Sequence, residues 1–278
     1  MIGFNSMQVR HQSGFTMVEL LIAGLLGLFL IAGVLQIFQS SNQNYKMQDD
    51  LAVIQEDGRL AQMFLEDQIQ QTGWNESGGE VIPADPLNIY ALVPTSDGTT
   101  DSLSITYWPY TDRDTGITYD KDCNGAAVAA GAPITNRFYV DTSKNQLMCL
   151  GSASTVAQPL IGGVEDFQLQ YGVDRYDNLG CPSSRVTSYM TASQLKTLAA
   201  TVGAAQNLVM PMSVKMAILL VSDDDILSEG VARYHQLLDK KVSIEATDKK
   251  LRRVFQSTIY MPNSAYSAQI TSQANGCY

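Results

Sequence analysis

The chain has 278 residues and a formal net charge of −10 at neutral pH, with 45% apolar and 17% charged residues. This composition is typical of a folded protein and excludes a disordered or collagen-like chain. The acidic balance does not favour nucleic-acid binding over the whole surface, and a count of two histidines excludes a histidine-rich metal site. At ~100–200 residues per domain, the length predicts one large domain, with or without an appendage.

A long apolar segment, residues 15–38, follows a short polar start that contains Arg10. A helix of this length spans roughly 36 Å, enough to cross a bilayer core of ~30 Å. A secretory signal peptide fits poorly, because its apolar region is usually ~7–15 residues long; a buried core helix is the other alternative. We expect a membrane span. The next basic residue is Lys46, so the positive-inside rule places the N-terminus in the cytoplasm.

Glu19 is the one acidic residue within this apolar segment. A carboxylate inside a membrane helix costs ~2.5–3.5 kcal/mol on insertion scales. Two interpretations follow. Either Glu19 lies close enough to the helix end to reach the lipid headgroups, or another chain supplies a partner charge.

The helix is expected to continue well beyond the apolar segment, because residues 39–71 contain no proline and a single glycine, Gly58. Apolar residues recur at three- and four-residue steps, which is typical of an amphipathic helix with one face against a core. Gly73 suits the position just after the helix end. The residues of this stripe are Met47, Leu51, Ile54, Ala61, Leu65 and Ile69.

The remainder of the chain is expected to be rich in β-strands, because short alternating segments replace the helical period. Two short helices are also expected, at 191–200 with Thr191 and Gln194 as a capping box, and at 226–241. The fold class is therefore α+β, with an antiparallel sheet packed on the second half of the long helix. The expected strands are 102–110, 136–141, 146–150, 164–173, 212–221 and 253–261.

The run Gly14-Phe15-Thr16-Met17-Val18-Glu19 resembles the N-terminal signal of type IV pilins and type II secretion pseudopilins. The resemblance implies that a prepilin peptidase cuts after Gly14, that Phe15 becomes the N-methylated first residue, and that Glu19 docks the subunit in a growing filament. Cleavage creates an α-amine that is largely cationic at neutral pH. Such a cation can pair with Glu19 of a neighbouring helix, and low dielectric strengthens the pair.

This resemblance divides the chain into four parts and implies a pilin-like fold. The membrane is expected to hold the helix before assembly, and the filament core to hold it afterwards. The parts are a leader (1–14), a transmembrane or filament-core helix (15–38), an amphipathic helix half (39–72) and a periplasmic or extracellular β-rich domain (73–278).

Four further segments, 58–74, 166–174, 214–223 and 252–263, resemble the PilW family of minor pilins. The resemblance implies a non-enzymatic subunit, first in the bacterial inner membrane and then in the pilus fibre at the cell surface. It would prime assembly near the tip with other minor pilins, the major pilin, a PilY-type tip adhesin and the inner-membrane assembly platform. The implied processes are twitching motility, adhesion and DNA uptake.

Two alternatives to this function remain open. PilW resembles pseudopilin J of type II secretion, so a subunit of a secretion pseudopilus is the nearest competitor. A membrane-anchored periplasmic enzyme or adhesin that uses loops within residues 100–190 is the alternative from another class. The sequence contains no P-loop, GxSxG, HExxH or dinucleotide-binding fingerprint, and these motifs carry much of enzyme chemistry. We therefore expect no catalytic residue and no cofactor.

The four cysteines all follow the apolar segment. An even count in a periplasmic domain predicts two disulfides. Three pairings are possible, and proximity along the chain favours Cys123–Cys149 with Cys181–Cys277. The absence of CxxC and the scarcity of histidine argue against a metal site.

An acidic run between residues 112 and 122 has alternating aspartates around Gly116, a pattern seen in calcium-binding loops. The EF-hand pattern fails, because the glycine comes one place early and the bidentate glutamate is missing. A solvated turn is the preferred interpretation. The aspartates are Asp112, Asp114, Asp120 and Asp122.

A basic run, Lys249, Lys250, Arg252 and Arg253, stands near the C-terminus. It would serve either as a local DNA contact or as a solvated run that begins a strand and pairs with Asp248 and Glu245. We favour the second interpretation, and nucleic acid is not an expected partner.

Overall fold

The computed structural model describes the chain with gaps, and the described residues are 14–74, 100–175, 181, 183, 185–195, 197, 209–227, 232–263 and 277. The chain divides into two compact units, Met1–Gln48 and Asp49–Tyr278. Helix α1 (Met17–Gln71) contributes residues to both units. The sequence predicted one continuous helix over residues 15–72; the helix is present, and it begins two residues later and ends one residue earlier than predicted.

Within the first unit, α1 presents apolar side chains on every side. Leu20, Phe29 and Ile37 are each about 70% exposed, at 69%, 71% and 72%. Thr16 precedes the helix as its N-cap, because its hydroxyl accepts a hydrogen bond from the Glu19 backbone N–H at 3.3 Å.

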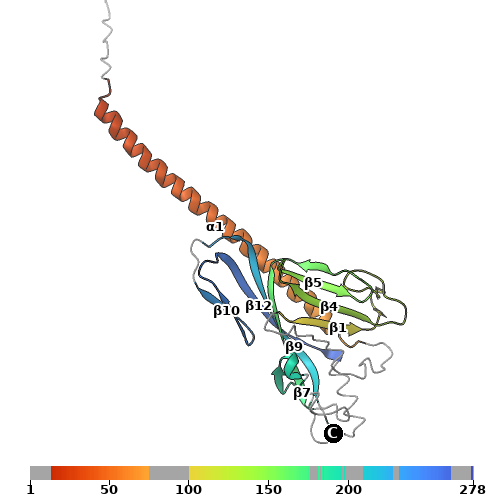
Figure 1. The fold of residues 1–278 in the computed structure, drawn as a ribbon. Coiled ribbons are helices and arrows are strands. Elements are labelled where there is room, and N and C mark those ends of the chain that lie inside the picture. The colour runs from red at the N-terminus through yellow and green to blue at the C-terminus, as the bar shows by residue number, and fades with distance from the viewer. Residues whose placement is uncertain are drawn as a thin grey trace, which may run out of the picture. The chain divides into compact units, whose positions relative to one another are not determined.

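Among its described residues, the second unit has two four-stranded antiparallel sheets and two two-stranded ribbons. Figure 1 shows how they are arranged. The first sheet has the order β1-β4-β5-β6, and the second sheet has the order β12-β9-β7-β8. The ribbons are β2–β3 and β10–β11. The strands are β1 (Ser102–Tyr107), β2 (Tyr110–Thr111), β3 (Thr118–Tyr119), β4 (Ile134–Asp141), β5 (Gln146–Gly151), β6 (Gln158–Ile161), β7 (Val164–Arg175), β8 (Ser188–Met190), β9 (Val209–Asp225), β10 (Arg233–Leu237), β11 (Lys240–Ile244) and β12 (Lys250–Tyr260).

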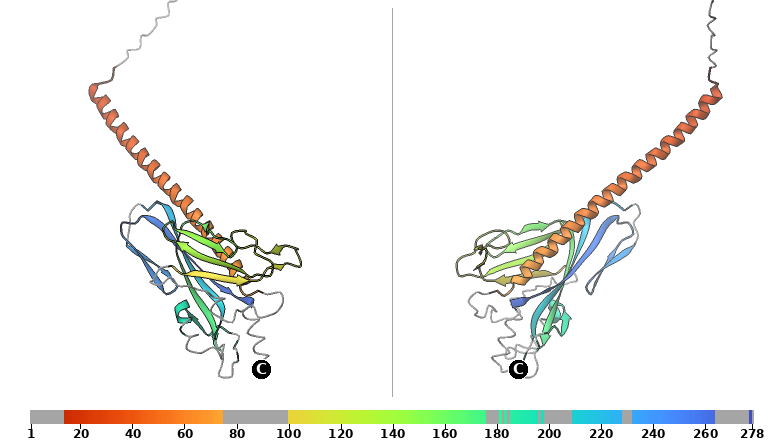
Figure 2. Two further views of the ribbon diagram at one scale, coloured as in Figure 1. Left: turned by 45° about the vertical axis from the view of Figure 1, so that its right-hand side comes forward. Right: turned by 180° about the vertical axis from the view of Figure 1, so that it is seen from behind.

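The second half of α1 packs on the face of the first sheet (Figure 2, right). The Phe64 and Phe138 rings meet edge to face with centroids 5.7 Å apart. One turn further on, Asn136 Nδ2 donates to Gln68 Oε1 at 3.0 Å in a buried hydrogen bond. Leu65 is fully buried between these contacts. Of the stripe predicted from spacing, the later residues Ile54, Ala61, Leu65 and Ile69 are buried in the core. The two earlier ones are not, since Leu51 is half-buried and Met47 is exposed.

Gly58 brings α1 close to the second sheet. A Cβ built at this position would overlap the Phe255 ring on β12. Gln62 on the next turn donates from Nε2 to the Gln256 backbone carbonyl at 3.1 Å. The single glycine of this helical stretch thus stands where the strand approaches most closely, and a side chain there would force the ring to move.

Strand β9 is central in the second sheet and is buried on both faces, which explains its almost continuous apolar sequence. Ile218 faces the main core, in register with Phe167 on β7 and Phe255 on β12. Leu219 points to the opposite face, in a separate small cluster with Leu237 of the β10–β11 ribbon.

The helix expected at 226–241 is wrong. Described residues of this segment form coil at 226–227 and then a β-hairpin, β10–β11, with its turn at Leu238-Asp239. Leu238 takes a positive φ of 56°. Every second residue of β10 is less exposed than its neighbours: Arg233 and His235 are half-buried, and Leu237 is fully buried against the outer face of the second sheet. The exposure of successive side chains therefore alternates with the period of two that is typical of a strand, and not with the period of a helix.

Two other expectations need smaller adjustments. The strand expected at 102–110 ends at Tyr107, and Tyr110 begins β2 beyond Pro109, which has no N–H to donate to a ladder. In the short helix expected at 191–200, residues 192–195 and 197 are helical. Its capping box is present: Thr191 N–H donates to Gln194 Oε1 at 2.9 Å, and Gln194 N–H donates to Thr191 Oγ1 at 3.3 Å. Residues 196 and 198–200 lie outside the described residues.

Candidate functional site

The candidate assembly residues Gly14, Phe15 and Glu19 lie at the start of α1. Phe15 is 84% exposed, and Glu19 is exposed in the first helical turn. Thr16 and Glu19 have the spacing of a capping box, in which an N-cap hydroxyl and an acid three residues on satisfy free N–H groups of the first turn. The bond from the Glu19 N–H to the Thr16 hydroxyl is one half of such a box, and Glu19 is the acid of the first helical turn, where a negative charge favours the helix start. The sequence interpretation did not consider this, although the Thr-x-x-Glu spacing signals it.

Helix α1 is long and apolar enough to cross a membrane, and none of its most apolar window is buried within the described chain. Large apolar patches on a soluble surface mark contact with lipid or with another protein. The first half of α1 therefore requires a medium that the rest of this chain does not supply.

The first disulfide joins Cys123 to Cys149, with Cα atoms 6.4 Å apart. Cys149 is fully buried on β5. Cys123 lies in the loop before β4, and its backbone N–H donates to Asn136 Oδ1 at 2.9 Å. Since Asn136 also bonds Gln68 of α1, the disulfide loop, the first sheet and the helix share one connected network.

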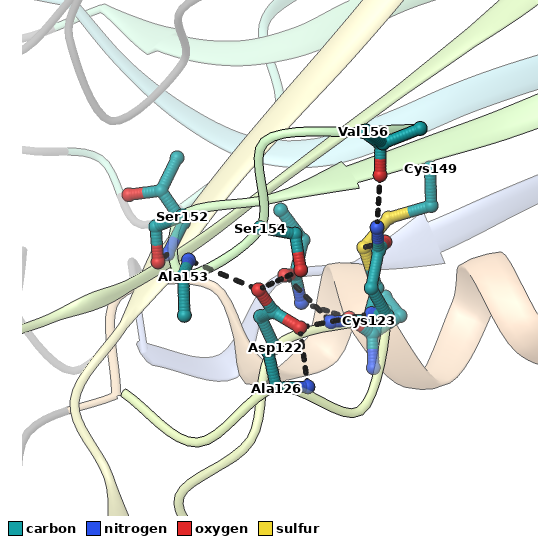
Figure 3. The surroundings of a disulfide bond; sticks show 12 residues. Asp122, Cys123, Ala126, Cys149, Ser152, Ala153, Ser154 and Val156 are labelled. Atoms are coloured by element: carbon teal, nitrogen blue, oxygen red, sulfur yellow. Dashed lines mark hydrogen bonds between the residues drawn. A yellow bond between two sulfur atoms is a disulfide. The ribbon is translucent and has the colours of Figure 1, made fainter. Parts of the chain in front are cut away.

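Asp122 organises the same loop from a buried position, 4% exposed. One carboxylate oxygen accepts the backbone N–H groups of Asn124 and Ala126, both at 3.0 Å. The other accepts the Ala153 N–H and the Ser154 hydroxyl, also at 3.0 Å (Figure 3). Asp122 is therefore structural. The sequence interpretation grouped it with the solvated aspartates, whereas the Asp-Cys-Asn-Gly turn signature at this point distinguishes it.

The second disulfide joins Cys181 to Cys277, with Cα atoms 5.7 Å apart and a sequence separation of 96. It ties the end of the chain to the segment that follows β7. Both disulfides have the pairing favoured by proximity along the chain, and no cysteine is free.

The solvated turn expected in the acidic run is present at Asp112. Its Oδ1 accepts the backbone N–H groups of Asp114 at 2.9 Å and Thr115 at 2.8 Å. Hydrogen bonds from Thr115 and Asp114 lower the pKa of the Asp112 carboxyl. Gly116 closes the turn between β2 and β3 with a φ of 68°. Within the described residues, no group of three or more His, Cys, Asp or Glu side chains is placed to hold a metal ion.

The basic run begins β12, and its most buried member is ion-paired. The Arg252 side chain is 5% exposed, and its Nε donates to Glu165 Oε2 at 2.6 Å. Its Nη2 donates to Asp248 Oδ2 at 2.8 Å. Hydrogen bonding from Arg252 lowers the pKa of Asp248 to about 2. The pairing with Asp248 was expected from the sequence, whereas Glu165 comes from β7 and gives no signal in the local sequence. Arg252 is therefore engaged within the protein rather than presented to a nucleic acid.

The comparisons with known proteins found one matching family model and similar solved structures. Residues 137–263, just under half of the chain, match the sequence model of a family described as Type IV Pilus-assembly protein W, PilW. A solved type IV-like pilin from Thermus thermophilus is similar at 14% identity and a TM-score of 0.40, over 79% of this chain and 98% of that chain. No curated protein matches. Over residues 137–263 the chain is therefore similar to the PilW pilus-assembly family, and a long apolar helix precedes this region.

Proposed function

We propose that this chain is a minor pilin, inserted in the bacterial inner membrane by residues 15–38 and then transferred into a pilus fibre. One observation carries the proposal. The first half of α1 exposes apolar side chains all round and contains one acid, Glu19. Lipid covers these apolar side chains before assembly, and the helices of neighbouring subunits cover them afterwards.

The proposed processing supplies the charge that Glu19 lacks within its own segment. A prepilin peptidase removes residues 1–14, and the new N-terminus at Phe15 is methylated but keeps its positive charge. The amine of one subunit pairs with Glu19 of its neighbour. In low dielectric this pair is stronger than in water, and it sets the axial register between the two helices.

The remainder of the chain, residues 73–278 in the proposal, stays outside the membrane as a structural domain. Its two disulfides suit an oxidising compartment such as the periplasm. The pilin assignment supports a non-enzymatic role in which surfaces, rather than a catalytic centre, carry the function. Its partners are other minor pilins, the major pilin, the inner-membrane assembly platform and a PilY-type tip adhesin, with which it primes assembly near the tip.

The test of the proposal must separate the charge of Glu19 from any contribution of its side chain to the start of α1. Glu19→Gln removes the charge and keeps a side chain that suits the third position of a capping box. Glu19→Ala removes both. We expect both variants to insert in the membrane and both to be depleted at least tenfold from sheared pili, an effect that corresponds to ~1.4 kcal/mol of lost docking free energy.

Mass spectrometry of the sheared wild-type fibre should find this chain at low abundance, starting at a methylated Phe15. Normal incorporation of Glu19→Gln would overturn the docking role. A fibre subunit that keeps residues 1–14 would overturn the processing. Deletion of the gene should abolish surface pili or twitching. Loss of protein secretion with normal pili would instead assign the chain to a secretion pseudopilus.

A further inference from the structure

The β10–β11 hairpin covers part of the outer face of the second sheet (Figure 1). Its apolar contact is small and separate from the main core: Leu237 is fully buried against Ala217 and Leu219 of β9. Backbone ladder bonds join β10 only to β11, and the two strands form their own sheet. Opening the hairpin as a unit would therefore break no ladder with the large sheet.

Polar contacts hold the margins of the hairpin. Lys240 Nζ lies 2.7 Å from Asp166 Oδ2, and Gln256 Nε2 donates to the Gln236 carbonyl at 3.1 Å. Arg233 Nη2 donates to the Lys250 carbonyl at 2.6 Å. Open clefts of about 470 Å³ and 560 Å³ border the hairpin, one along β11 and one at its turn. Water therefore reaches the hairpin from two sides.

His235 lies on the face of β10 that points to the sheet, between Arg233 and Leu237 in the alternation of the strand. Its Nε2 is buried and has no hydrogen-bond partner in the described part of the chain. An unpaired nitrogen at a docking interface tolerates the neutral imidazole far better than the imidazolium, which needs a partner for each of its N–H groups.

The charges that face His235 disfavour a third cation. Arg233 on its own strand and Arg252 on β12 both repel an imidazolium, and Glu165 on β7 attracts it. The Glu165 carboxylate is already held by Arg252 at 2.6 Å and 3.0 Å. Asp248, which shares Arg252 with Glu165, bonds Arg252 at 2.8 Å and lies 3.9 Å from Arg233, and Asp166 is paired with Lys240. No acid of this set is left over to neutralise a charged His235.

We propose that the β10–β11 hairpin is a pH-sensitive flap, docked on the second sheet while His235 is neutral and released when His235 takes up a proton. Release uncovers the outer face of β9 around Ala217 and Leu219. Mild acid thus converts a covered sheet face into an exposed one without unfolding the main core.

The sign of the effect follows from the surroundings of His235. Burial first, and then Arg233 and Arg252, lower the pKa of the docked imidazole. The undocked imidazole regains a pKa of ~6.5, and each unit of difference changes the docking equilibrium about tenfold. The docking of the hairpin is therefore strongest above that pH, and it weakens as the pH falls through that value. The pKa of Asp248 is about 2, so its ion pairs persist throughout this range.

Hydrogen exchange on the full chain in detergent micelles tests the proposal. Peptides within residues 232–244 are compared at about pH 7.5 and about pH 5.5, after correction for the intrinsic exchange rate. In the wild type we expect several-fold loss of protection at the lower pH, with strands β7 and β9 unchanged. His235→Gln and His235→Phe cannot take up the proton and should keep the same protection at both values.

A second measurement is independent of any variant at this position. The chain has two histidines, His11 and His235, so His11→Gln assigns both ring signals in an NMR titration. His235 should titrate below His11. An equal loss of hairpin protection in the wild type and both His235 variants would overturn the proposal. Titration of the two histidines at the same pH would overturn it as well, even if the variants fail to fold.

Discussion

The two halves of α1 share one backbone conformation and differ in what surrounds their side chains. Leu30 in the first half is 72% exposed, whereas Leu65 in the second half is fully buried. The first half is apolar on every side. The second half has one apolar stripe, which packs on the first sheet through contacts such as Phe64 with Phe138.

This difference shows that a helix pattern carries information about solvent as well as about conformation. A single stripe specifies one interface within the same chain, and a helix that is apolar all round specifies a surrounding medium. In this molecule the disulfides, the buried Asp122 and the Gln68–Asn136 bond all belong to the unit that contains the second half. Substitutions at matched positions of the two halves should therefore have very different effects on the stability of the domain.

The largest difference is expected between Leu65→Ala and Leu30→Ala. Truncation of a buried leucine costs about 2–5 kcal/mol, because apolar contact is lost and a cavity remains. Leu65→Ala should lower the free energy of unfolding by this amount, and Leu30→Ala should leave it unchanged. Urea unfolding of the full chain in detergent measures both. The fluorescence of Trp74 and Trp108 reports on the folding of the domain, since the two residues are joined by a hydrogen bond from the Trp108 backbone N–H to the Trp74 backbone carbonyl at 3.0 Å.

Equal losses in these two variants would contradict the comparison, because the first half of α1 would then contribute to the core of the domain. As a control, the apolar replacement Leu65→Met keeps most of the volume. It should cost less than ~1.5 kcal/mol.

A smaller difference is expected between Gln68→Leu and Gln36→Leu. Gln68 Oε1 accepts from buried Asn136 Nδ2, so an apolar replacement takes this acceptor away from a buried donor, at a cost of about 1–3 kcal/mol. Gln36 is exposed in the first half, and its replacement should not change the free energy of unfolding. The double variant Gln68→Leu with Asn136→Ala should not recover full stability, since Asn136 Oδ1 also accepts from the Cys123 N–H.

Periodicity in the sequence was sufficient for the elements with strong local patterns. The three- and four-residue spacing predicted that Ile54, Ala61, Leu65 and Ile69 face a core, and all four are buried. The continuous apolar run of β9 predicted a central strand, and β9 lies between β7 and β12. Each of these features follows from the residue pattern of one continuous segment, so it can be predicted from the sequence without knowledge of the segment's neighbours in the fold.

Two features that join distant segments were missed because their partners are set by the fold, whereas the pairing of the two disulfides was predicted from the cysteine spacing. The ion pair of Arg252 with Glu165 connects β12 to β7. The β10–β11 hairpin was read as a helix, since its burial depends on Ala217 and Leu219 of another strand. The assembly residues Gly14, Phe15 and Glu19 remain predictions from the signal motif, and their partners belong to other molecules.

The smallest difference is expected between Gly58→Ala and Gly27→Ala. Alanine favours a helix over glycine by about 1 kcal/mol, and a Cβ at Gly27 would meet no atom within 4 Å in this chain. Gly27→Ala should therefore not destabilise the domain. At Gly58 the new Cβ would overlap the Phe255 ring, and such overpacking costs about 1–3 kcal/mol. We expect a net loss of stability in Gly58→Ala, and partial recovery when Phe255→Leu removes the ring. If Gly58→Ala is instead as stable as the wild type, the Phe255 ring can move aside freely, and the close approach of α1 to β12 does not require glycine.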